Sequence, residues 1–138
     1  MPNYFYEDEE KTILKESLLT DKAENWAKMF LKPRRSEKIY ERNPFLTSAQ
    51  LRKFYSEVKS LETKIEAKGF PQTKPLVKML KSKAAYACPK TGRERKIPVE
   101  FREYIYEMVD AVEDEKDFKA FAIIFEAVVG FFYGEGGR

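Results

Sequence analysis

Apolar residues recur at intervals of three and four along most of the chain, which is the spacing of one face of an α-helix. The clearest helix start is at Thr47, which forms a capping-box pair with Gln50 and is flanked by the staple pair Leu46 and Leu51. The apolar face that follows carries Leu51, Phe54, Tyr55, Val58, Leu61 and Ile65. Gly69 is a typical helix stop. The pattern therefore predicts a helix from Thr47 to Gly69.

The other periodic segments predict about four more helices. They lie at residues 9–31 (one or two helices, broken near Thr20), at residues 73–87, from Pro98 onwards, and from Asp114 to Gly134. Pro75 and Pro98 are expected in the first turns of their helices, where a missing N–H is tolerated. The second half of the last helix is apolar almost all round, which predicts a central place in the core or in an interface. The first six residues are expected to be frayed or docked on a neighbour.

No strand-type alternation of Val, Ile and Thr occurs, and no Asn-Gly or Asp-Gly hairpin signal. The sequence therefore predicts an all-α fold, a compact bundle of about five helices with mostly antiparallel neighbours. A chain of 138 residues is expected to form a single domain, residues 1–138. Residues 32–46 are expected to be a basic linker, because Pro33 and Pro44 prevent a continuous helix.

The amino-acid composition excludes several kinds of catalytic and metal site. The chain has no histidine and a single cysteine, Cys88, which excludes a His-dependent triad, an intramolecular disulfide and a zinc cluster. The longest apolar run, residues 120–133, is too short to span a bilayer, and no signal peptide is apparent. We expect a cytoplasmic protein without membrane contact, cofactor or bound metal.

Charge is distributed unevenly along the chain. Residues 32–96 carry 18 Lys and Arg against six acidic residues, whereas residues 97–138 carry four against ten. This predicts a polyanion partner, or pairing between the basic middle and the acidic ends. Within residues 74–96 there are eight basic residues and one acid, so local pairing partners are absent and binding to a nucleic-acid backbone is favoured. Tyr86 could stack on a base there, although an aromatic residue at helical spacing is more often part of a core.

An acidic stripe follows the helix that Pro98 opens. Its members are Glu100, Glu103, Glu107, Asp110 and Asp114. A solvated helix face is the most ordinary interpretation. Two others stay open: a Mg²⁺ site of a nuclease that uses Glu100, Glu103 and Glu107, and a contact with the basic surface of the next copy in an open stack.

Three ordered blocks carry a family resemblance. They are LTSAQLRKFY at residues 46–55, LKSKAAYA at residues 80–87 with the Gly92-Arg93 pair after it, and residues 118–133 with FEAVV at 125–129. In this order and spacing they resemble the small-subunit family of type III-A CRISPR effector complexes, the Csm small subunit. The resemblance implies a family core at residues 46–133, preceded by a variable N-terminal helical segment and basic linker at residues 1–45.

This resemblance implies a non-catalytic subunit of an antiviral ribonucleoprotein. Several copies are expected to stack along the guide RNA–target RNA duplex and to contact its backbone without reading sequence, because base pairing reads the sequence. The implied partners are the target and guide RNA, other Csm subunits, and further copies of the chain, with a homodimer as one option in isolation. RNA cleavage is assigned to other subunits, so no enzymatic activity is expected.

The residues expected to bind RNA combine the basic middle with the matched blocks. They are Arg52, Lys53, Lys78, Lys81, Lys83 and Arg93. The alternative hypothesis is a helical protein–protein interaction module, whose basic surface docks an acidic partner or another copy of the chain.

Overall fold

The computed structural model describes residues 3–138, whose regular structure is entirely helical. In chain order the helices are α1 (Glu16–Leu19), α2 (Asp21–Phe30), the 3₁₀ turn η1 (Ile39–Glu41), α3 (Ser48–Lys68), α4 (Phe70–Ala87), α5 (Val99–Ala111) and α6 (Glu115–Gly134). Because α1 is a single turn, the bundle has five longer helices, as the sequence predicts. Across residues 3–138 there is no β-strand, only two isolated bridges. No helix in that range is both long and apolar enough to span a bilayer.

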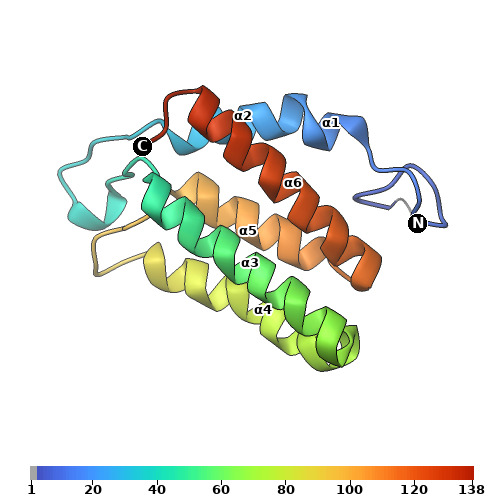
Figure 1. Ribbon diagram of the computed structural model, residues 1–138. Helices are drawn as coiled ribbons and strands as arrows, with labels where there is room; N and C mark the ends of the chain where they lie inside the picture. The colour runs from blue at the N-terminus through green and yellow to red at the C-terminus, as the bar shows by residue number, and fades with distance from the viewer. Residues whose placement is uncertain (1–2) are drawn as a thin grey trace.

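The helices form a bundle with α3 and α4 on one side and α1 and α2 on the other (Figure 1). Helices α5 and α6 lie between them, and α5 packs against both α4 and α2. Most neighbours run antiparallel: Trp26 and Phe30 of α2, for example, contact Tyr104 and Phe101 of α5 in reverse order. The exception is α2 with α6, which pack together and run in the same direction (Figure 1). The predicted all-α bundle with mostly antiparallel neighbours is therefore confirmed.

Phe101 of α5 joins three other helices at the centre of the core. Its ring centroid lies 5.1 Å from that of Phe30 on α2, 5.1 Å from that of Phe54 on α3 and 6.3 Å from that of Phe125 on α6. Edge-to-face pairs of this kind contribute about 0.5–1.5 kcal/mol each beyond area burial. Phe101 and Phe125 are fully buried, whereas Ile123 and Tyr133 on α6 are 44% and 41% exposed. The last helix therefore contributes one face to the core, and its second half is not central all round as the sequence predicts.

Helix α3 begins and ends where the sequence predicts. The Thr47 hydroxyl accepts a hydrogen bond from the Gln50 N–H at 3.2 Å, and the Gln50 side chain accepts one from the Thr47 N–H at 2.9 Å. Gly69 ends the helix with φ near 89°, a conformation that residues with a Cβ rarely adopt. Since α4 starts at Phe70, Gly69 is the only residue between the two helices.

The predicted start of α4 at residue 73 is wrong by three residues. The helix begins at Phe70, and Pro71 rather than Pro75 occupies the first turn. Pro75 lies inside the helix, which continues through it with one backbone hydrogen bond fewer. For α5 the difference is one residue, because Pro98 is the residue before the helix rather than its first.

The predicted helix over residues 9–15 does not form. Instead the chain makes a tight turn, in which the Asp8 carboxylate accepts hydrogen bonds from the N–H groups of Thr12 and Ile13. Tyr6 and Leu14 pair as an isolated antiparallel bridge, and Lys11 takes a left-handed φ of 58°. Asp side chains that bond to nearby backbone compete with helix formation in this way, so helical structure starts only at Glu16.

The start of the chain packs on the chain's own core, which corrects the expectation of a frayed segment. Phe5 is fully buried and Tyr6 is 7% exposed. The Tyr6 hydroxyl donates a hydrogen bond to the carbonyl oxygen of Lys116, and the Tyr4 hydroxyl donates one to Glu107. Met1 and Pro2, which belong to the same expected segment, lie outside the described residues.

Candidate nucleic-acid interface

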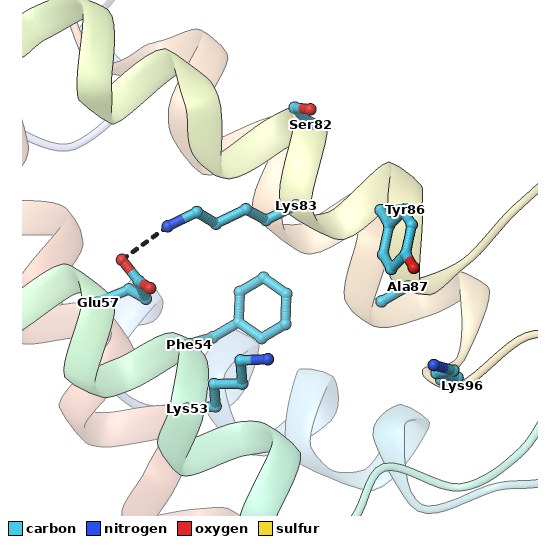
Figure 2. A pocket seen from close by; sticks show the side chains of 8 residues that line it. All are labelled: Lys53, Phe54, Glu57, Ser82, Lys83, Tyr86, Ala87 and Lys96. Atoms are coloured by element: carbon cyan, nitrogen blue, oxygen red, sulfur yellow. Dashed lines mark ion pairs between the residues drawn. The ribbon is translucent and has the colours of Figure 1, made fainter.

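A groove of about 530 Å³ lies between α3 and α4, at the end of the bundle where α4 passes into the loop 88–97. Its main side chains are Lys53, Phe54 and Glu57 from α3, Lys83 and Tyr86 from α4, and Lys96 from the loop. Figure 2 shows these side chains around the space between the two helices. We call this feature the α3–α4 groove.

The α3–α4 groove has an apolar floor and a basic rim. Phe54 is 7% exposed and packs on Phe101 below it, whereas Lys53 is exposed and has no ion pair within residues 3–138. The acidic residue of the lining, Glu57, pairs with Lys83 at 2.8 Å. Exposed pairs of this kind are worth about 0–1 kcal/mol, so Lys83 can exchange Glu57 for a phosphate at little cost.

Tyr86 is the most exposed aromatic ring of the groove, which corrects the expectation that it belongs to the core. Its side chain is 65% exposed. The guanidinium carbon of Arg93 lies 4.8 Å from the ring centroid and the Lys96 ammonium 6.0 Å. A solvent-exposed ring close to two cations is chemically able to stack on a nucleic-acid base while the cations neutralise phosphates.

The loop 88–97 is held at several points. The Lys96 N–H donates to the Ala87 carbonyl at 2.8 Å, and the Gln50 side-chain amide donates to the Lys96 carbonyl at 2.7 Å. Arg102, only 8% exposed, donates to the Cys88 carbonyl at 3.0 Å. These bonds fix the two ends of the loop, including the backbone that presents Lys96. Sequence patterns gave no signal for the part played by Arg102, which lies among the apolar residues of α5.

The six residues predicted to bind RNA do not lie on one surface. Lys53 and Lys83 line the α3–α4 groove and Arg93 covers its Tyr86 ring. Lys78 and Lys81 are on the flank of α4 that faces α5. The Lys78 ammonium donates to the carbonyl of Val109 at 3.0 Å, near the C-terminal end of α5, where a cation is stabilised by the helix dipole.

Lys81 and Arg52 also have partners inside the molecule. The Lys81 ammonium pairs with Asp110 at 2.7 Å and lies over the Tyr106 ring. The Arg52 Nε donates to the Tyr133 hydroxyl at 2.7 Å, towards the end of α6. Neither residue has an acidic neighbour close to it in the sequence. The fold instead brings Asp110 to Lys81 and Tyr133 to Arg52 from distant helices.

The acidic stripe, which runs along α5 and ends at Asp114, the N-cap of α6, is largely paired within the chain. Glu100 pairs with Arg34 at 2.8 Å, Asp110 with Lys81, and Asp114 with Lys11 at 2.7 Å. Two of these pairs join the basic middle to the acidic C-terminal segment, which is one of the two outcomes that the charge pattern predicts. No group of three or more His, Cys, Asp or Glu within residues 3–138 is arranged to hold a metal ion.

Glu100 shows how these pairs change acid–base behaviour. Partial burial acts to raise the pKa of its carboxyl group. Hydrogen bonds from Arg34, the backbone and Asn43 outweigh burial and hold the pKa below its usual value. Glu100 therefore remains ionised in the folded chain and contributes to stability in that form.

Comparison with known proteins yields one match. A family model described as Csm2 Type III-A matches residues 14–137, which is nearly the whole chain and includes α1 to α6. None of the curated proteins and none of the solved structures compared matches the chain.

Proposed function

The chain belongs to the Csm2 Type III-A family, the small subunits of type III-A CRISPR effector complexes, and we propose from this premise that it binds RNA backbone through the α3–α4 groove. In this role several copies stack along the guide RNA–target RNA duplex, next to other Csm subunits. The subunit acts as a scaffold in antiviral defence and performs no catalysis itself. Because its proposed ligand is RNA, we infer that the subunit acts in the cytoplasm.

The observation that carries the proposal is the exposed Tyr86 ring next to two cations. Arg93 and Lys96 lie close to the ring, and Lys53 and Lys83 line the same groove. Lysine and arginine neutralise phosphates and release counterions, which supplies affinity for any sequence. The aromatic face accepts any base. No cluster of Asn and Gln side chains lines this groove, so it lacks the usual means of reading base edges.

We also propose that the predicted basic residues outside the groove contribute in the assembled complex. Arg52, Lys78 and Lys81 have intramolecular partners, but the pairs of Arg52 with Tyr133 and of Lys81 with Asp110 are at the surface. A second strand or a neighbouring copy could replace those partners. The groove residues Lys53, Lys83 and Arg93 are expected to dominate binding by the isolated chain.

A titration against fluorescent RNA tests the proposal. The purified chain is mixed with single-stranded RNA and with a guide–target duplex at two salt concentrations. We expect salt-sensitive binding that does not depend on sequence. Lys53→Ala is expected to weaken it and to flatten the slope of log affinity against log salt by about 0.7–0.9 for each phosphate that the variant no longer neutralises. Lys22→Ala serves as the control, because Lys22 is exposed on α2 at the far side of the bundle.

Two results would contradict the proposal. The first is equal competition by heparin of matched charge together with indifference to RNA length. Such a result would favour the alternative function, a protein–protein module whose basic surface docks an acidic partner or another copy. The second is Mg²⁺-dependent cleavage of labelled RNA that Glu103→Ala abolishes, which would identify a nuclease.

A further inference from the structure

A second basic concavity, of about 420 Å³, lies between the linker and the loop 88–97. Both segments are at the same end of the bundle (Figure 1). We call this feature the arginine concavity, because its cations are Arg34, Arg35, Arg42 and Arg95. Glu94 is the acidic residue of its lining. The α3–α4 groove, in contrast, is lined by lysines.

The arginine side chains retain hydrogen-bond donors for a ligand. Arg35 is exposed and forms no side-chain hydrogen bond or ion pair within residues 3–138. Arg42 uses only its Nε, which donates to the Ser36 carbonyl at 2.8 Å. Arg95 forms one hydrogen bond within the same described region, from Nη1 to the Glu41 carbonyl. Its Nε is buried, so only its terminal nitrogens can meet a ligand. Guanidinium groups match the geometry of phosphate oxygens better than ammonium groups do.

The linker that carries these arginines is fixed in place by Asn43, which is 1% exposed. The Asn43 side-chain oxygen accepts from the Val99 N–H at 2.8 Å, and its amide nitrogen donates to Glu100 at 2.8 Å. Its backbone forms two hydrogen bonds with Arg34, at 2.7 and 2.9 Å. Asn43 thus joins the linker to the first turn of α5. A site on this frame is pre-organised, which reduces the entropy cost of binding.

The arginine concavity and the α3–α4 groove are next to each other along the loop. Lys96 lines the groove, and its chain neighbours Arg95 and Glu94 line the concavity. Phe45, immediately after the linker residue Pro44, has a side chain that is 49% exposed. The loop therefore carries basic side chains to both features, Lys96 to the groove and Arg95 to the concavity.

We propose that the arginine concavity is a second RNA phosphate site, which receives the strand as it leaves the α3–α4 groove and crosses the loop 88–97. This proposal rests on the proposed function, because the first site must hold RNA for the second to extend the path. It gives the linker, which lies N-terminal to the matched blocks of the sequence, a direct role in binding. The bound strand is longer than one groove can hold.

RNA length separates the two sites experimentally. Single-stranded oligonucleotides of about 4 and about 12 nucleotides span the range that one or more binding surfaces cover. The variant is Arg35→Ala, and the matched control is Lys38→Ala, which removes one exposed positive charge from the same linker outside the concavity. Circular dichroism and thermal unfolding check that both variants fold.

We expect Arg35→Ala to bind the longer RNA about tenfold more weakly, as for the loss of one charge-assisted hydrogen bond. Its affinity for the short RNA should stay within about twofold of wild type. Lys38→Ala should match wild type for both. Arg35→Lys, which keeps the charge but not the forked donors, should recover only part of the loss.

Other results overturn the second site in distinguishable ways. If Lys53→Ala weakens both RNAs while Arg35→Ala changes neither, the proposed function stands and the arginine concavity is not an RNA site. If wild type binds neither RNA, the result contradicts the proposed function, and the second site is overturned with it. If Arg35→Ala leaves RNA affinity intact but abolishes self-association in sedimentation, the concavity holds acidic side chains of a second copy instead.

Discussion

The side-chain amide nitrogen of Gln50 donates a hydrogen bond to the carbonyl oxygen of Lys96 at 2.7 Å. The same side chain closes the capping box of α3 through its oxygen, which accepts from the Thr47 N–H. One glutamine therefore joins the start of a helix to the loop that presents Lys96 to the α3–α4 groove. The side-chain oxygen of Gln50 therefore caps the helix and its nitrogen holds the loop. Substitutions at this position can remove one of these bonds without the other.

Gln50→Glu should preserve the helix start and release the loop. A carboxylate can still accept from Thr47 but cannot donate to Lys96. We expect faster hydrogen exchange at the N–H groups of Lys96 and Ile97, with thermal stability close to wild type. Gln50→Ala loses both tasks and should cost about 1–2 kcal/mol. Unchanged exchange at Lys96 in Gln50→Glu would show that the loop is held without this bond.

Tyr86→Ala should weaken RNA binding by about 1–3 kcal/mol, the usual contribution of one base–aromatic stack. Because the side chain is 65% exposed, the unfolding temperature should hardly change. Tyr86→Phe keeps the ring and should bind like wild type. Fluorescence anisotropy at one fixed salt concentration measures all three proteins, and equal affinity of the Ala variant would exclude stacking on this ring.

Lys11→Met should destabilise the fold by about 3 kcal/mol, the cost of leaving a buried carboxylate without its counter-charge. The Lys11 ammonium lies 3.0 Å from Asp117, whose side chain is 4% exposed. Urea unfolding measures the loss. The double variant Lys11→Met/Asp117→Asn removes the uncompensated charge, so it should recover much of the stability. A double variant as unstable as the single one would argue against this explanation.

Glu100→Gln should make stability less dependent on pH in acid. The pKa of Glu100 is lower in the folded chain than its ordinary value of 4.5, so the unfolded chain binds the proton first as pH falls. Its contribution is therefore complete above the ordinary value and is lost as pH falls through the folded-state pKa. Thermal unfolding from pH 7 to about pH 3 should show a flatter decline in the variant. Glu66→Gln, an exposed carboxylate on α3, should retain the wild-type profile.

Short sequence motifs predicted the helix ends that depend on contacts between neighbouring residues. The capping box at Thr47 and the stop at Gly69 involve residues within a few positions of each other, and both are confirmed. Pro75 was misleading, because either of two prolines four residues apart could mark a first turn. The Asp8 turn was missed since its carboxylate bonds to the backbone of Thr12 and Ile13, and such bonds compete with a helix that periodicity alone favours.

The candidate site was predictable in composition but not in geometry. The residue counts located a basic region, yet only the fold shows that Lys53 and Lys83 face the α3–α4 groove while Lys78 faces α5. Contacts between residues far apart in the chain decide this division. Asn43 is an example, because its partners Val99 and Glu100 are more than fifty positions away and no spacing rule connects them.

Contacts between the N-terminal segment and α6 determine the order in which parts of the chain can fold during synthesis. Phe5 and Tyr6 are buried, and the Tyr6 hydroxyl reaches the backbone of Lys116 in α6. Helix α2 also packs mainly on α6. On the ribosome these early segments emerge long before their partners. The α3–α4 hairpin, closed by Gly69 alone, can form while translation continues, but the core closes only after α6 has left the exit tunnel. Until then the apolar faces of α2 and the first residues are exposed to solvent or to a chaperone.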